Sequence, residues 1–183
     1  MTATTAYNQT KFTELLLHVA ERSSGDPRFG KTKLNKILFY IDFLAYKTKG
    51  NSVTGATYQR RPMGPVPMQI VQAKAALIAE GAATNETRDF MGYKQERLIA
   101  AREADLSVFS EAELQVIDSV IVGLWDHTGS SVSDISHGEP GWRLADEKDT
   151  IPYESVFIGD RELTGADIAR GQQIWAELQL APA

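Results

Sequence analysis

The 183-residue chain contains no cysteine, which excludes disulfides, thiolate zinc sites and thiol nucleophiles. Long apolar runs are also missing: the run at residues 37–46 is interrupted by Asp42 and is far shorter than the ~20 residues of a membrane span. Residues 1–7 lack the charged and apolar blocks of a signal peptide. We therefore expect neither secretion nor membrane insertion, and we expect a cytoplasmic location.

Basic residues are scarce in the second part of the chain. Residues 1–75 carry 11 basic and 4 acidic side chains, a net charge of +7, whereas residues 76–183 carry 8 and 20, a net charge of −12. Residues 103–142 contain eight carboxylates and no Lys or Arg. The total charge of −5 argues against a protein that coats DNA or an anionic membrane, and the acidic stretch predicts a negative surface.

Hydrophobic periodicity predicts a mainly α (α+β) fold. The composition, 43% hydrophobic and 23% charged without internal repeats, is typical of one globular domain, here residues 1–183. The pattern predicts a compact helical domain of five to six helices with a small two- or three-stranded β element. We expect helices at about 10–23, 34–49, 67–80, 111–128, 130–136 and 164–180, an extended segment at 53–58 and a hairpin at 83–99.

Local signals fix several element ends. Ser110 and Glu113 have capping-box spacing, and Pro67 suits the first turn of the helix that Gly81 ends. Gly129 should end the helix that follows Ser110, with Trp125 on its inner face, and residues 130–131 should cap the next turn. Residues 137–141 predict a loop before Trp142. In the last helix, Thr164 is the expected N-cap with Asp167 at the third position, and Ile168, Ile174, Trp175 and Leu178 are the expected apolar residues.

No arrangement of residues predicts an active site. Of the three histidines, only His137 has acidic neighbours, Asp134 and Glu139, and a metal site needs three or four converging ligands. Ser133 and Ser136 lie too close to His137 in sequence to form a catalytic triad around one reacting atom. Phosphate-loop spacing of glycines is missing. We therefore expect a protein that is not an enzyme and has no metal site and no cofactor.

A stripe of cations, Lys33, Lys36 and Lys47, shares one side of the second helix with Tyr40. Lys31, Arg60 and Arg61 join it if the following connection folds back. A solvated basic face is the simpler interpretation, because cations commonly line helix exteriors. The alternative is a binding patch for an acidic partner or nucleic acid.

Two separated segments carry a family resemblance. The first is Lys33-Leu34-Asn-Lys36-Ile-Leu38-Phe-Tyr40, followed by Tyr58-Gln-Arg-Arg-Pro-Met-Gly64-Pro65-Val66. The second contains Ser136-His137-Gly-Glu-Pro140-Gly-Trp142. Over about residues 10–150 the chain resembles the Panacea domain, the SocA-like antitoxin family. Most of these residues also suit structural roles: Gly64 and Pro65 a tight turn, Tyr58 a position beneath it, Trp142 the core.

The resemblance implies a bacterial or prophage antitoxin that neutralises a toxin encoded beside it by direct binding, without catalysis. One relative instead acts as an adaptor that delivers its toxin to a protease. Toxins paired with this family include alarmone-synthetase-like enzymes that modify tRNA. We expect the acidic stretch at Glu111, Glu113 and Asp118 to occlude a basic, RNA-binding or ATP-binding toxin surface; the competing face is Lys33, Lys36, Arg60 and Arg61. A homo-oligomer is compatible with this interpretation.

The alternative from another class is a winged-helix-like nucleic-acid-binding regulator, formed by the helix that ends at Gly81 and the hairpin after it. Such a module needs a basic recognition helix, and residues 69–81 offer only Lys74 against Glu80. A nucleic-acid partner is therefore the weaker interpretation.

Overall fold

The computed structural model describes residues 6–159 and 164–180. Within these ranges the α-helices are α1 (Gln9–Arg22), α2 (Lys31–Lys49), α3 (Ile70–Ala79), α4 (Glu111–Gly123), α5 (Gly129–His137), α6 (Pro140–Leu144) and α7 (Gly165–Leu180). The strands are β1 (Tyr58–Gln59), β2 (Val66–Pro67), β3 (Ala83–Phe90), β4 (Tyr93–Ala100) and β5 (Thr150–Ile151). Two short 3₁₀ turns are η1 (Leu106–Val108) and η2 (Tyr153–Phe157). The predicted fold class, mainly α with small antiparallel sheets, is confirmed.

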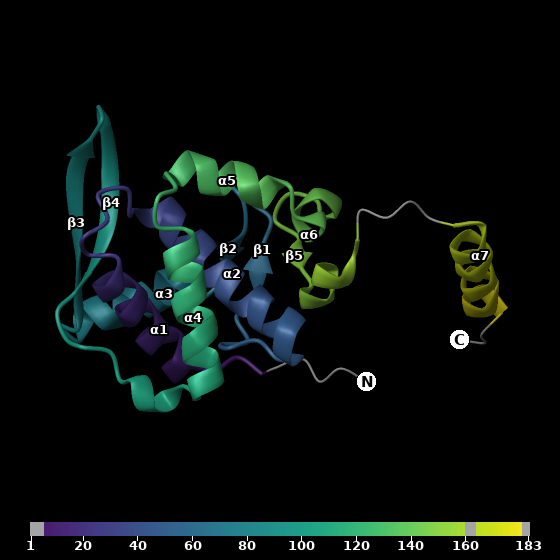
Figure 1. Cartoon of the computed structure of the whole chain (residues 1–183), viewed down its shortest axis with the longest axis horizontal. Coiled ribbons are helices and arrows are strands. Elements are labelled where there is room, and N and C mark those ends of the chain that lie inside the picture. Colours follow the sequence, from purple (N-terminus) through teal and green to yellow (C-terminus); the bar gives the residue numbers. More distant parts are fainter. Residues whose placement is uncertain (1–5, 160–163, 181–183) are drawn as a thin grey trace.

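Helix α2 is the central element of the fold. It packs against α1, α4, α5 and β4, and its ends reach both sheets (Figure 1). Its sequence explains this position, because apolar side chains such as Leu34, Ile37 and Ile41 leave little of its surface polar. Gly50 ends it in the left-handed conformation at φ 79°. The expectation that this helix forms the core is confirmed.

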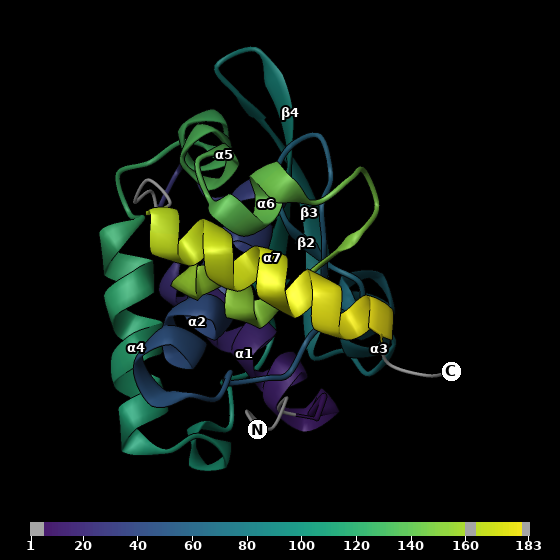
Figure 2. The same cartoon turned by 90° about the vertical axis from the view of Figure 1, so that its right-hand side faces the viewer.

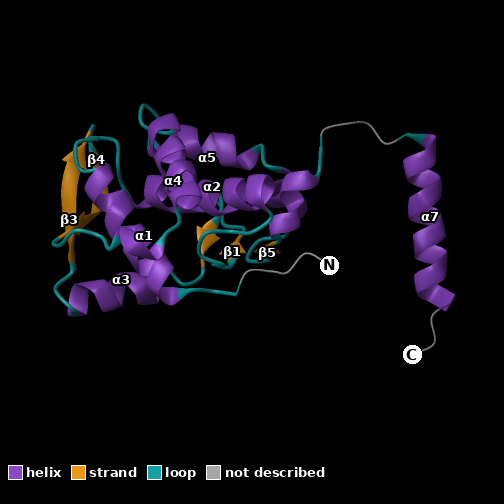
Figure 3. Cartoon of the chain, turned by 60° about the horizontal axis from the view of Figure 1, so that its bottom comes forward, coloured by secondary structure: helices purple, strands orange, loops and turns teal. Residues whose placement is uncertain are grey.

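The strands form two separate sheets rather than one. A three-stranded antiparallel sheet has the order β2-β1-β5, and β3 pairs with β4 from Ala83↔Ala100 to Phe90↔Tyr93. Figure 3 shows the two sheets at opposite sides of the helices. The predicted hairpin is confirmed. Pro67 lies in β2 opposite Tyr58, so its expected place in the first turn of α3 is wrong; as an edge-strand residue it needs no ladder donor there.

The region after Ser110 follows the sequence with three corrections. The Ser110–Glu113 capping box is present. Helix α4, however, ends at Gly123, and Gly129 begins α5, where Thr128 caps the helix and Ser131 returns the bond. Trp125 is 36% exposed, because the apolar stripe of α4 continues through Val116 and Val120 instead. Pro140 opens the short helix α6, since proline suits a first helical turn, so Trp142 is helical.

Helix α7 matches the last predicted helix and lies apart from the other elements (Figures 1 and 2). The Thr164 carbonyl accepts from the Ile168 amide at 3.1 Å. The side chains of Asp167, Ile174, Trp175 and Leu178 fall outside the described residues. Among the helices of residues 6–159 and 164–180, none has the length and hydropathy needed to cross a bilayer.

Candidate functional site

Lys33 joins the start of α2 to two other segments. Its Nζ pairs with Asp26 Oδ2 at 2.5 Å and donates to the carbonyls of Trp125 and His127 at 2.7 and 2.8 Å. The ion pair is buried, with both side chains 1% exposed. All three protons of the ammonium therefore have an acceptor, as a buried cation requires. Burial lowers the pKa of Lys33, and the Asp26 carboxylate opposes this effect.

Lys36 is fully buried, with 0% exposure, one turn further along α2. Its Nζ donates to the Pro65 carbonyl at 3.0 Å. Gly64 packs directly against it: a Cβ at position 64 would overlap Lys36 Cε and Ser136 Oγ, and the φ of Gly64 is 92°. Glycine is thus required here by space and by backbone conformation. With no carboxylate beside it, burial lowers the pKa of Lys36 to about 7.

The expected basic face of α2 is therefore wrong for Lys33 and Lys36, because both ammonium groups point inward and replace helix-surface solvation by backbone carbonyls. Arg60 is also engaged: its guanidinium lies 4.3 Å from the centre of the Trp142 ring, and its Nε donates to the Trp142 carbonyl. Of the four residues of the competing face, Arg61 is the exposed one.

A second buried polar group lies on the opposite side of α2. The carboxylate of Asp42 accepts from the Thr54 amide, the Thr54 hydroxyl and the Tyr58 hydroxyl at 2.6–2.8 Å. Burial raises the pKa of Asp42 to about 6 although the three donors oppose this effect. Tyr58 is buried against Phe39 and Phe43, in the place expected for it. The charge that interrupts the apolar run of α2 is thus an internal anchor for residues 54–58.

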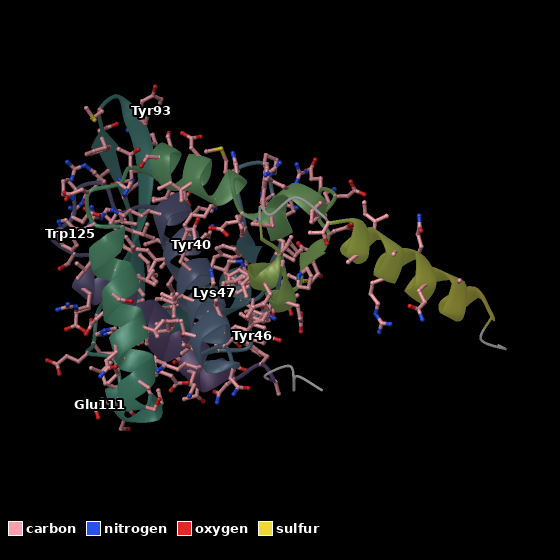
Figure 4. All side chains as sticks on the ribbon, turned by 45° about the vertical axis from the view of Figure 1, so that its right-hand side comes forward. Tyr40, Tyr46, Lys47, Tyr93, Glu111 and Trp125 are labelled. Atoms are coloured by element: carbon pink, nitrogen blue, oxygen red, sulfur yellow. The ribbon has the colours of Figure 1, made fainter. Side chains whose placement is uncertain are left out.

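His137 and Trp142 connect α5, α6 and the β1–β2 connection. Their rings stack at 4.1 Å and 22°, and the Trp142 Nε1 donates to the Arg61 carbonyl at 3.1 Å. Pro140 opens α6 between them, and Leu34 and Val66 pack into the adjoining core. Tyr40 faces the same corner, where burial and then Glu139 raise its pKa (Figure 4).

The serines near His137 serve packing. Ser133 Oγ donates to the Met63 carbonyl at 2.9 Å, and Ser136 Oγ donates to the Ser133 carbonyl at 2.8 Å. Both hydroxyl protons are therefore directed to backbone oxygens rather than to the histidine. Among the described residues, the structure contains no group of three or more His, Asp or Glu side chains placed to hold a metal.

The acidic stretch pairs with the basic N-terminal part of the chain. Lys11 bridges to Glu113 at 2.6 Å, Arg22 to Asp118 at 3.4 Å and Arg28 to Asp126 at 3.9 Å. Glu113 is half-buried and also closes the capping box, whereas Asp118 stays exposed. Glu111 is exposed at the start of α4, where Figure 4 labels it. The opposite charges of the two parts of the sequence thus meet within the fold.

Sequence reasoning missed a groove of about 460 Å³ between the β3–β4 hairpin and the N-terminal ends of α2 and α5. We call it the hairpin groove; its lining is Arg28, Gly30, Lys31, Thr32, Lys33, Met63, Phe90, Met91, Tyr93, Lys94, Gln95, Glu96, Thr128, Gly129 and Ser130. Figure 4 labels Tyr93 near the hairpin tip. The available signal was the apolar tip sequence Phe90-Met91-Gly92-Tyr93, which a turn in water does not need.

The buried residues of the family resemblance build the walls of this groove. Lys33 holds the α4–α5 connection against the start of α2, and the Ser133 bond to the Met63 carbonyl fixes the β1–β2 connection on α5. From the opposite wall, Gln95 Nε2 donates to the Pro27 carbonyl at 3.2 Å. The groove is therefore bounded by elements that are internally cross-linked.

Comparison with known proteins gives one family. The family model described as antitoxin SocA-like, Panacea domain matches residues 34–143, more than half of the chain and all of the fold from α2 through most of α6. No curated protein matches, and no solved structure matches.

Proposed function

Since the chain belongs to the SocA-like antitoxin family with a Panacea domain, we propose that it is the antitoxin of a toxin–antitoxin pair and neutralises a protein toxin by direct binding, without catalysis. The family match over residues 34–143 is the observation that carries this proposal. It fits the chemistry of the site, because the side chains that sequence reasoning considered for catalysis, Ser133 and Ser136, use their hydroxyls to connect backbone segments.

The acidic surface of α4 is a proposed contact for the toxin. Glu111 and Asp118 lie exposed on this helix, which begins with the positive end of its dipole covered by the capping box. A basic nucleotide-binding or RNA-binding surface, as in the alarmone-synthetase-like toxins paired with the family, has the complementary charge. Glu113 contributes to the fold through Lys11 and Ser110 and is a poor probe of binding.

Co-expression with the product of the adjacent reading frame tests the function. We expect that product to stop growth when expressed alone, the full chain to restore growth, and the two proteins to co-purify. An adjacent product that does not inhibit growth, or restored growth without co-purification, contradicts direct neutralisation. Toxin that disappears only when a cellular protease is present would instead identify the adaptor mode.

A charge-reversal pair tests the acidic surface. The double variant Glu111→Lys and Asp118→Lys leaves the capping box intact, so the protein should fold while its affinity for the toxin falls at least about tenfold. Glu147→Lys is the matched control, since Glu147 is exposed and lies outside the acidic stretch. Unchanged affinity of the double variant contradicts α4 as the contact.

A further inference from the structure

The tip of the β3–β4 hairpin carries a residue that neither the turn nor water favours. Met91 and Gly92 connect the paired Phe90 and Tyr93, with φ angles of 50° and 83°. Two-residue hairpin turns with both φ values positive prefer Asn, Asp or Gly, and a methionine in this conformation is strained by about 1 kcal/mol. Met91 is also 82% exposed. Local stability therefore does not explain the methionine.

The side chains around Met91 extend the exposed apolar surface. Tyr93 is 77% exposed, and Met63 is exposed on the other side of the hairpin groove. Figures 1 and 2 show the hairpin projecting beyond the helices. In the described ranges every methionine, Met63, Met68 and Met91, is exposed, and none belongs to the core. Methionine adapts its shape to a partner at a binding surface, and this distribution is the one that such a use requires.

The charge of the groove is positive. Arg28, Lys31 and Lys94 are the cations on its exposed lining, against the single carboxylate of Glu96. The N-cap of α2, Gly30, provides no side-chain acceptor, so the amides at the start of this helix face the groove without a capping carboxylate or hydroxyl. A partner that places carboxylates at this end of α2 gains from the cations and from the helix dipole.

We propose that the hairpin groove is the docking surface for the toxin, with Met91 and Tyr93 inserting into an apolar cleft whose rim carries carboxylates that meet Lys31 and Lys94. This inference rests on the proposed antitoxin function and names a second surface with a charge opposite to that of α4. The partner is a protein rather than a nucleic acid, because Glu96, Asp89 and Asp126 pair with Lys31, Lys94 and Arg28 and would repel phosphates. Lys74, the single cation of α3, is half-buried.

The first test separates binding from folding. Met91→Asn places a favoured residue in the turn, so the variant should fold and resist urea at least as well as the wild type. Its affinity for the growth-inhibiting product of the adjacent reading frame should fall at least about tenfold, and Tyr93→Ala should behave alike. Met68→Asn is the matched control, an exposed methionine outside the groove, and should bind within about twofold of wild type.

The second test concerns charge. Lys31→Glu should weaken toxin binding at least about tenfold and increase its sensitivity to salt, whereas Lys49→Glu at the other end of α2 should leave it unchanged. A labelled duplex DNA and a labelled RNA of equal length serve as further probes. Salt-dependent affinity for either that Lys31→Glu abolishes would overturn the assignment of a protein partner.

The outcomes distinguish the two proposals. A wild-type chain that neither binds nor neutralises the adjacent product contradicts the antitoxin function and the docking surface together. A wild-type chain that neutralises it while Met91→Asn, Tyr93→Ala and Lys31→Glu keep full affinity contradicts the docking surface alone. Loss of affinity in these three variants, with unchanged Met68→Asn and Lys49→Glu, supports both.

Discussion

The interior around α2 and the tip of the hairpin reverse the usual distribution of polarity. Inside, Lys33, Lys36 and Asp42 are buried among apolar side chains. Outside, Met91 and Tyr93 are among the most exposed side chains of the described fold. Buried charge costs stability unless every proton or lone pair finds a partner, and exposed apolar surface gains nothing until a partner covers it. The first region thus specifies how the elements are joined, and the second is free to serve binding.

The comparison predicts its largest effect where the buried ion pair is broken. Lys33→Met leaves the Asp26 carboxylate buried without its cation and deprives two carbonyls of their donor. We expect a loss of about 3–5 kcal/mol in the free energy of unfolding, measured by urea denaturation. Lys31→Met, an exposed change in the same helix, should alter it by less than about 0.5 kcal/mol. Equal effects of the two would contradict the structural role of Lys33.

The close approach of the β1–β2 connection to α2 should give the next effect. Gly64→Ala places a methyl group against Lys36 and Ser136 and strains a φ of 92°. The free energy of unfolding should fall by about 2–4 kcal/mol. Gly25→Ala has open space around its Cβ and is the control. Adding Ser136→Ala to Gly64→Ala should restore part of the loss; no restoration would mean that the contact is not the cause.

The buried amine of Lys36 predicts a pH effect. Its pKa is lowered to about 7 in the folded state, so between pH 7 and the ordinary lysine value the unfolded chain binds more protons. The free energy of unfolding therefore rises with pH in this window, by about 2 kcal/mol from pH 7 to 9. Lys36→Met should remove that rise. Asp42, whose pKa is raised to about 6, acts below this window, where its stabilising contribution is lost as pH rises toward 6 and above.

The smallest predicted effect lies at the surface between the two regions. Arg60→Ala removes the cation over the Trp142 ring and one bond to its carbonyl, and should cost about 1 kcal/mol. Arg61→Ala removes an exposed side chain and should cost less than about 0.5 kcal/mol. Thermal unfolding measured for both variants would test the difference. A larger loss for Arg61→Ala would reverse the assignment of these two arginines.

Local sequence signals predicted the elements of this fold well. Helical periodicity gave α1 and α2 to within a few residues, and the Ser110–Glu113 spacing gave the start of α4. They could not give β5, because residues 150–151 are a strand only through pairing with β1. Lys33 and Lys36 were misjudged for the same reason: their acceptors are backbone carbonyls about 30 and 90 residues away, which no helical pattern contains.

The candidate site was predicted less completely. The acidic stretch was recognised from composition, but its partial neutralisation by Lys11 and Arg22 depends on α1 packing beside it. The hairpin groove combines residues of five separate segments, so only the tip sequence carried a local signal. Whether a side chain faces a partner is decided by tertiary packing that periodicity alone does not encode.

The exposed methionines also make the hairpin groove the place where oxidants act first. Peroxide converts methionine to its sulfoxide, a polar group, and the thioethers of Met63 and Met91 are accessible while the described core contains none. Mild oxidation should therefore leave the fold intact and turn the apolar tip polar. The toxin would then be released by a chemical change that a methionine sulfoxide reductase can reverse.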